Sequence, residues 1–282
     1  MKINENVELL QGDCLELMDC IPDKSVDMIL CDLPYGTTKC KWDKIIPFEP
    51  LWEQYNRIIK DNGIIALFGT EPFTSILINS NLKGYKEKLT WIKHKPSNFA
   101  CARYMHLKYT EDIVIFAYKS HTFNKQMQPR KSERVSQAQL GKSKKFNTVR
   151  TDGNEVSMQT LYEPKDWNEY DAKFKNPMDY IEIPSVVSNS KEKVNHPTQK
   201  PVKLLEYLIK TYTNEKELVL DNCMGSGSTG VACINTNRKF IGIEKEDKYF
   251  EIAKNRIVEV IDKEIMLCYT YINNKRYKVS NK

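Results

Sequence analysis

The sequence predicts an α/β fold, a largely parallel sheet with helices on both faces. Short apolar, β-prone runs at residues 26–31 and 63–69 alternate with stretches of helical spacing, such as residues 48–59. Two apolar runs end on an acid that a turn follows, at Asp32 and at Asp221. Because the carboxyl ends of parallel strands line the ligand crevice of such sheets, we expect both acids at one edge.

The remaining elements follow from the same periodicities and from their end signals. Strands are expected at residues 7–10, 88–95, 111–118, 217–221 and 240–244, with an edge strand at 266–272. Helices are expected at residues 15–21, 71–81, 202–209, 231–234 and 249–261. Asp13 is placed to cap the first of these helices, and Pro201 suits the first turn of the helix that follows it.

Composition narrows the class of protein. The chain has 282 residues, of which 40% are hydrophobic, and a formal net charge of +6. Its eight cysteines form no CxxC pair and no metal-ligand spacing with the four histidines, which indicates reduced thiols in a cytoplasmic protein and no metal site. No apolar run approaches the roughly 20 residues that a membrane-spanning helix needs, and the amino terminus is not a signal peptide.

A basic segment interrupts the α/β pattern. Residues 119–150 hold nine Lys or Arg and one acid, Glu133, so the segment carries a charge of +8. Such a run is either a solvated or disordered loop or a segment whose cations neutralise nucleic-acid phosphates. In the second case the candidate contacts are Lys125, Arg130, Lys131, Arg134, Lys142, Lys144 and Lys145.

A late glycine turn predicts a nucleoside-binding βαβ unit, although a turn of unrelated purpose is the alternative. The turn runs from Gly225 to Thr229, and its glycines let the backbone bend sharply and approach a ligand. Glu244 ends the next strand at about the spacing expected of an acid that binds ribose hydroxyls. The turn lacks the lysine of a P-loop and fits a dinucleotide site only partly.

Two motifs together resemble those of amino-group DNA methyltransferases, which methylate N6 of adenine or N4 of cytosine. The tetrapeptide Asp32-Leu33-Pro34-Tyr35 is similar to the family's Asp-Pro-Pro-Tyr signature, with Leu33 in place of the first proline. Residues 196–201 and 221–229 look like the family's cofactor half, although Asn222 and Cys223 replace a more usual proline and aromatic. The tetrapeptide comes first, as in the permuted, beta-type class, and the resemblance covers roughly residues 5–118 and 194–260.

The resemblance implies a Rossmann-like methyltransferase sheet that uses S-adenosyl-L-methionine and no metal. It implies a catalytic half at residues 1–118, an inserted target-recognition region at 119–193, a cofactor-binding half at 194–264 and a basic tail at 265–282. It also implies double-stranded DNA as substrate. It leaves open whether a cognate restriction endonuclease is a partner, and members of this class often form homodimers.

By the same resemblance, Asp32 and the Leu33 carbonyl accept the two N–H groups of the target amine, and Tyr35 stacks on the extruded base, so that Asp32, Leu33, Pro34 and Tyr35 form the catalytic set. Phe99 is the expected contact to that base, and Arg103 joins the basic segment as a DNA contact. The cofactor-binding residues implied are Asp13, Cys14, Asp32, Thr198, Gln199, Lys200, Asp221, Gly225, Gly227, Ser228, Thr229 and Glu244.

The aspartate that begins the tetrapeptide favours adenine, because serine is commoner there in cytosine enzymes. N4-cytosine is therefore the first alternative. Methylation of RNA or of protein glutamine is a second, since those enzymes use a related tetrapeptide placed after the glycine motif. A DNA-binding module with an inactive cofactor pocket and a nicotinamide oxidoreductase are the remaining alternatives.

Overall fold

The structure is a computed structural model that describes residues 1–37, 40, 43–129, 149–151, 154–156 and 174–280. The chain forms two compact units, the first made of Met1–Asn124 with Met178–Lys282 and the second of Lys125–Pro177. The second unit is shorter than the insert expected at residues 119–193, because residues 119–124 and 178–193 belong to the first unit.

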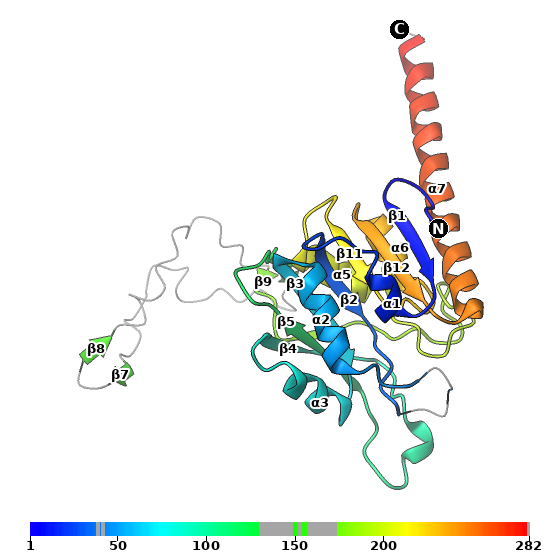
Figure 1. Ribbon diagram of the computed structural model, residues 1–282. Coiled ribbons are helices and arrows are strands. Elements are labelled where there is room, and N and C mark those ends of the chain that lie inside the picture. Colours follow the sequence, from blue (N-terminus) through cyan, green and yellow to red (C-terminus); the bar gives the residue numbers. More distant parts are fainter. Residues whose placement is uncertain (38–39, 41–42, 130–148, 152–153, 157–173, 281–282) are drawn as a thin grey trace. The chain divides into compact units, whose positions relative to one another are not determined.

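An eight-stranded sheet forms the centre of the first unit (Figure 1). Its strands are β1 (Val7–Gln11), β2 (Val26–Cys31), β3 (Ile59–Gly69), β4 (Tyr85–Ile92), β5 (Thr110–Phe116), β10 (Tyr180–Glu182), β11 (Leu218–Asp221) and β12 (Lys239–Glu244). Their order is β1-β12-β11-β2-β3-β5-β4-β10. The neighbours from β1 to β3 are parallel, whereas β5 runs antiparallel to both β3 and β4. The predicted α/β class is confirmed, but the reversed direction of β5 could not be predicted from its residues.

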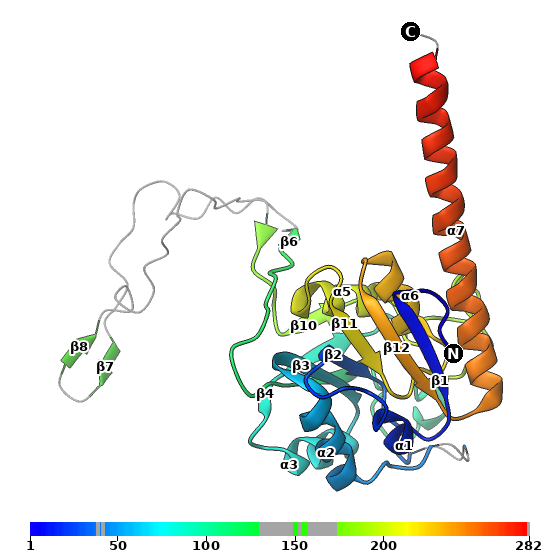
Figure 2. The same ribbon diagram turned by 45° about the horizontal axis from the view of Figure 1, so that its top comes forward.

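Helices cover both faces of this sheet, as Figure 2 shows. They are α1 (Cys14–Met18), α2 (Phe48–Ile58), α3 (Phe73–Ser80), α5 (Val202–Tyr212), α6 (Ser228–Asn235) and α7 (Asp247–Ser280), with a short 3-10 turn η1 (Phe99–Cys101). Alternate residues of β2 face opposite ways, so Met28 and Leu30 pack with α5 and α6, whereas Ile29 and Cys31 pack with α1 to α3.

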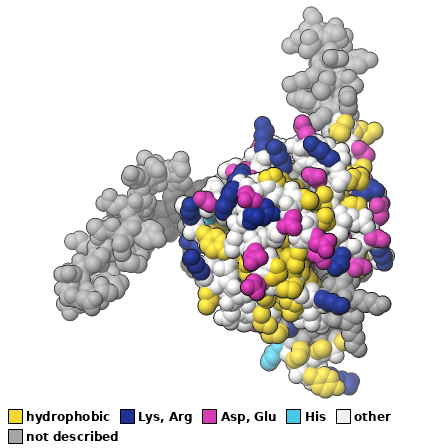
Figure 3. All heavy atoms as spheres, viewed as in Figure 1, with side chains coloured by type: hydrophobic (Ala, Val, Ile, Leu, Met, Phe, Trp, Pro, Cys, Tyr) yellow, Lys and Arg dark blue, Asp and Glu magenta, His cyan; other side chains and the backbone are white. Residues whose placement is uncertain are grey.

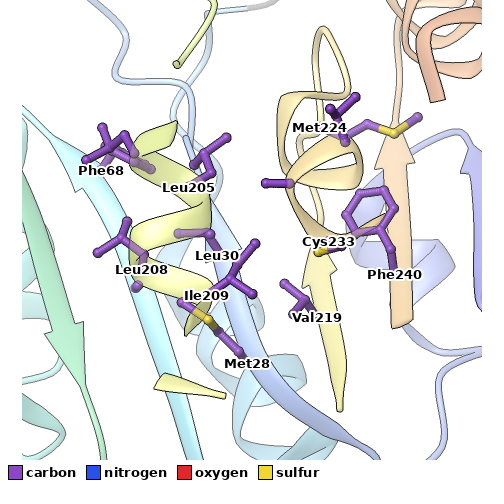
Figure 4. Close-up of a cluster of buried hydrophobic side chains, with 14 of the residues drawn as sticks. Met28, Leu30, Phe68, Leu205, Leu208, Ile209, Val219, Met224, Cys233 and Phe240 are labelled. Carbon is purple, nitrogen blue, oxygen red and sulfur yellow. The ribbon is translucent and has the colours of Figure 1, made fainter. Parts of the chain in front are cut away.

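The core on the α5 and α6 side is a dense apolar cluster, part of which Figure 4 shows. Leu205, Leu208 and Ile209 of α5 pack in one cluster with the sheet residues Met28 and Leu30. All five side chains are 2% exposed or less. This packing holds the amino end of α5, and the loop before it, over the carboxyl end of β2.

The predicted edge strand at residues 266–272 is wrong, because these residues continue helix α7. The segment is rich in β-prone side chains, but no glycine or proline separates it from the helical pattern of residues 249–261. Without such a stop signal the helix extends through it. No helix among the residues that the structure describes is long and apolar enough to cross a membrane.

The described part of the second unit consists of two short antiparallel pairs. Strand β6 (Gln128–Pro129) pairs with β9 (Phe174–Lys175), and β7 (Val149–Thr151) pairs with β8 (Asn154–Val156). Lys125 is exposed. The other predicted phosphate contacts lie outside the described residues, namely Arg130, Lys131, Arg134, Lys142, Lys144 and Lys145.

Candidate active site

The two sequence motifs meet at one edge of the sheet. Strands β2 and β11 pair in parallel, with Val219 opposite Met28, so the residues after them emerge side by side. A cavity of about 1240 Å³ opens there and is lined by both Asp32 and Gly225. Since pockets for a single small ligand usually measure roughly 300–1,000 Å³, this cavity has room for two ligands in contact.

Asp32 lines the cavity and accepts a hydrogen bond on each of its carboxylate oxygens. Tyr35 Oη donates to Asp32 Oδ1 at 2.6 Å, and Lys200 Nζ lies 2.5 Å from Asp32 Oδ2. Burial raises the pKa of Asp32, while the Lys200 ammonium opposes that rise. The Tyr35 ring stacks on Phe73, with ring centroids 4.9 Å apart.

The second and third tetrapeptide residues, Leu33 and Pro34, also line the cavity. The Leu33 side chain is buried in the core on the α1 to α3 side. The core therefore accommodates a leucine side chain at the position where the family's signature has a proline.

Two charged residues that the sequence did not single out complete the surroundings of Asp32. Glu111 Oε1 lies 2.9 Å from Lys200 Nζ and 3.2 Å from Tyr35 Oη, and Glu111 Oε2 lies 3.3 Å from Lys93 Nζ. Because β5 is antiparallel to its neighbours, its first residues reach the edge where the parallel strands end. The two acids Glu111 and Asp112, directly before an apolar run, were the one available signal.

The glycine turn is held by the acid that ends β12. Gly225 N donates to Glu244 Oε2 and Glu246 N donates to Glu244 Oε1, each at 2.8 Å. Gly225 has φ +50°, and a Cβ there would lie 2.9 Å from Nε2 of His196. Burial lowers the pKa of that histidine to about 4. The turn therefore presents backbone to the cavity, closely backed by a neutral ring.

Gly227 shapes the turn without lining the cavity. Its φ is +70°, and a Cβ would lie 2.9 Å from the Cβ of Ala253 in α7. Only glycine fits this left-handed position against the helix.

Asp221 acts inside the turn as a buried brace. Thr229 Oγ1 donates to Asp221 Oδ2 at 2.6 Å, and Cys223 N donates to Asp221 Oδ1 at 3.1 Å. Burial raises the pKa of Asp221 to about 7. Ser228, the first residue of α6, makes a different contact: its Oγ accepts a hydrogen bond from Arg256 Nη1 at 2.8 Å.

The other predicted cofactor residues line the cavity and differ in their burial and in their hydrogen bonds. Asp13 caps α1 by accepting from Leu15 N at 3.0 Å, and its ion pair with Lys245 lowers its pKa. Gln199 is hydrogen-bonded to the preceding loop, since its Nε2 donates to the Glu192 carbonyl at 2.7 Å. The remaining two, Cys14 and Thr198, are buried and exposed, respectively.

A projecting loop between β4 and β5 borders the cavity. Its residues Ser97, Asn98 and Lys108 line the cavity, whereas Phe99 is 74% exposed and does not. Arg103 is also exposed on this loop. Figure 3 shows hydrophobic side chains beside a histidine and a basic residue at the lower end of the first unit, where this loop lies. The structure does not bring Phe99 into the cavity.

A family model described as DNA methylase, N6_N4_Mtase, matches residues 26–255. This chain belongs to the DNA methylase family. The resemblance seen in the two motifs is confirmed. Among the described residues, no group of three or more histidine, cysteine or acidic side chains could hold a metal ion.

Individual proteins of known name agree with the family assignment. The type II methyltransferase M2.MboI of Moraxella bovis is 31% identical to this DNA methylase, and the match covers 91% of the present chain and 89% of M2.MboI. The DNA adenine methyltransferase YhdJ of Escherichia coli (strain K12) is 27% identical, over 90% and 83%. The crystal structure of an M1.HpyAVI–SAM complex has the same fold, with a TM-score of 0.56 at 23% identity over 89% of this chain and 98% of that one.

Proposed function

We propose that this DNA methylase transfers a methyl group from S-adenosyl-L-methionine to N6 of adenine in duplex DNA, with the target base extruded from the helix. The observation that carries the proposal is that Asp32 and the glycine turn share one cavity with room for a nucleobase beside a cofactor. Adenine is favoured by the aspartate of the tetrapeptide and by the likeness to YhdJ.

The residues around the glycine turn fit an adenosyl group. The backbone at Gly225 is open to the cavity, where a side chain would collide with His196. Glu244 accepts the backbone N–H groups of Gly225 and Glu246, and in this proposal the remaining acceptor capacity of its carboxylate binds the ribose hydroxyls. Asp13 lies after the adjacent strand β1, where it can accept from the adenine amine. When bound there, the cofactor supplies an electrophilic methyl group.

The tetrapeptide can make an exocyclic amine a better nucleophile. The lone pair of such an amine is delocalised into the ring, so the nitrogen is a poor nucleophile. Asp32 and the Leu33 carbonyl accept its two N–H bonds, which favours a localised lone pair and stabilises the positive charge that develops on nitrogen. Tyr35 lines the cavity and is supported from behind by stacking on Phe73, and in this proposal the extruded base stacks on the part of its ring that faces the cavity.

The loop beside the cavity is our proposed DNA contact in the first unit. Phe99 and Tyr104 are 74% and 85% exposed, and Arg103 and Lys108 add positive charge close to the cavity. Aromatic and basic side chains in this mixture suit unpaired bases and phosphates. The basic segment beginning at Lys125 is the second proposed contact. By analogy with the type II relatives, we also propose that a restriction endonuclease of the same specificity accompanies this enzyme.

The Asp32→Ala variant tests the mechanism. We expect methyl transfer from radiolabelled cofactor to unmethylated DNA to fall by at least about 100-fold, because the main acceptor for the developing charge is lost. Cofactor affinity, measured by calorimetry, should stay close to that of the wild type. The matched control is Asp112→Asn, since that carboxylate is bonded to Thr74 and Lys88 and does not line the cavity. Near-normal transfer in the Asp32 variant would rule the mechanism out.

The modified base is tested separately, because the family includes both N6-adenine and N4-cytosine enzymes. DNA from cells that express this chain would be digested to nucleosides and analysed by mass spectrometry. We expect N6-methyladenine. N4-methylcytosine in its place would favour the alternative, and single-molecule sequencing would then give the recognition site in either case.

A further inference from the structure

Glu111 lies inside the cavity next to Asp32, although it belongs to neither sequence motif. Only 11% of its side chain is exposed. Its Oε1 lies 2.9 Å from the Lys200 ammonium and 3.2 Å from the Tyr35 hydroxyl. These are the same two groups that bind the oxygens of Asp32, so the two carboxylates share their hydrogen-bond donors.

The shared donors occupy both oxygens of Asp32 in this structure, one donor on each. Tyr35 carries one hydroxyl proton, which it gives to Asp32 Oδ1 at 2.6 Å and can give to only one acceptor at a time. Lys200 has three N–H bonds and lies 2.5 Å from Asp32 Oδ2. A target amine that donates to Asp32 adds a third donor beside these two, and Glu111 Oε1 is a second acceptor within reach of both Tyr35 Oη and Lys200 Nζ.

We infer that Glu111 is a positioning residue for methyl transfer, which takes up the Tyr35 hydroxyl and the Lys200 ammonium when the target amine donates to Asp32. The inference rests on the proposed function. Lys93 holds the other oxygen of Glu111 at 3.3 Å and keeps the side chain in place during this exchange. Glu111 forms and breaks no covalent bond in the reaction.

The charges of the cluster support this role. Burial alone would raise the pKa of Glu111, but Lys200 and Lys93 outweigh it and lower that pKa, so Glu111 is an anion that can hold a cation. Its negative charge in turn raises the pKa of Asp32. The titratable groups that face Asp32 are Lys200 before α5, Glu111 of β5, Tyr35 after β2, Cys31 of β2 and Asp221 of β11.

The Glu111→Gln variant removes the charge and keeps the shape. We expect kcat for methyl transfer to fall by about 100-fold, the size of effect that misplaced reacting groups produce. The KM for DNA and the cofactor Kd should stay within about threefold of the wild type, since neither ligand needs Glu111 to bind. The acid limb of the kcat–pH profile should move to lower pH, because a like charge beside Asp32 is gone.

The matched control is Glu87→Gln. Glu87 Oε1 also accepts from a tyrosine hydroxyl, that of Tyr212, at 3.1 Å, but it lies outside the cavity. We expect wild-type kcat and an unshifted pH profile from this control. The variant Glu111→Asp keeps the charge on a shorter side chain and should lose less activity than Glu111→Gln, with its acid limb unshifted.

Several results would overturn the inference. The first is a kcat of Glu111→Gln within about threefold of the wild type. The second is an equal loss of kcat in Glu111→Gln and Glu87→Gln. The third is a loss of kcat in Glu111→Asp as large as that in Glu111→Gln. If Glu111→Gln fails to bind the cofactor, the pH profile of Glu111→Asp decides alone, and a shifted acid limb there would contradict the inference. A wild-type protein that methylates no DNA would instead refute the proposed function.

Discussion

Replacing Asp221 with asparagine should reveal a carboxylate that destabilises this protein at neutral pH. Asp221 is 4% exposed, and its two oxygens accept from an uncharged hydroxyl and a backbone N–H. Burial raises its pKa from 3.8 to about 7. Because the folded state favours the protonated form, the stability from this group is complete below about pH 4 and is lost as pH rises toward 7.

The magnitude follows from that pKa difference. At 1.36 kcal/mol for each pH unit, ionising Asp221 in the folded protein costs about 4 kcal/mol in full. Asparagine avoids this cost and keeps both hydrogen bonds, since its Oδ1 can accept from Cys223 N and its Nδ2 can donate to the Thr229 hydroxyl.

Urea unfolding of both proteins at several pH values is the assay. We expect Asp221→Asn to gain about 2–3 kcal/mol on the wild type between pH 5 and pH 8, and comparison at each pH cancels the other titrating groups. A stability difference that does not change with pH, or an asparagine variant that is the less stable of the two at pH 8, would refute the reasoning.

Two further substitutions separate the glycine turn from the core. Gly227→Ala should cost about 1–2 kcal/mol for the left-handed conformation alone, with more from the contact at Ala253, and it should weaken cofactor binding by calorimetry because the turn must shift. Leu208→Ala, in the core under α5, should cost about 2–5 kcal/mol in urea unfolding and leave cofactor affinity unchanged in the folded protein. Equal cofactor affinity for Gly227→Ala and the wild type would contradict the expectation for the glycine turn. A weakened cofactor affinity in Leu208→Ala would contradict the expectation for the core.

Much of the fold could be predicted from sequence periodicity, but strand direction could not. Apart from Asp27, the run at residues 26–31 is apolar because β2 is covered by helices on both faces. An apolar run has the same composition in either direction, so the reversal of β5 had no local signal. Residues 266–272 show the related limit, since β-prone side chains follow a helix that nothing stops.

The site was predictable where it is made of short contiguous motifs. Asp32, Tyr35 and Gly225 all line the predicted cavity. The role of Asp221 inside the turn was not visible, because it depends on a hydroxyl eight residues away. Lys200 was expected near the cofactor, and that assignment stays a prediction, but its Nζ lies on Asp32, 168 residues away in sequence. Contacts of this kind come from strand order, which the local sequence does not encode.

The pairing of β2 with β11 explains why the permuted order of motifs is compatible with one site. Leu218 N donates to Asp27 Oδ2 at 2.9 Å near the start of both strands, and Lys200 reaches Asp32 just beyond the end of β2. The two halves are thus joined directly at both ends of β2. Because the distance between Asp32 and Gly225 is set by this register, it does not depend on which half comes first in the chain. Because neither contact involves the 53 residues of Lys125–Pro177, we expect changes in that unit to leave Asp32 and the glycine turn at the same edge of the sheet.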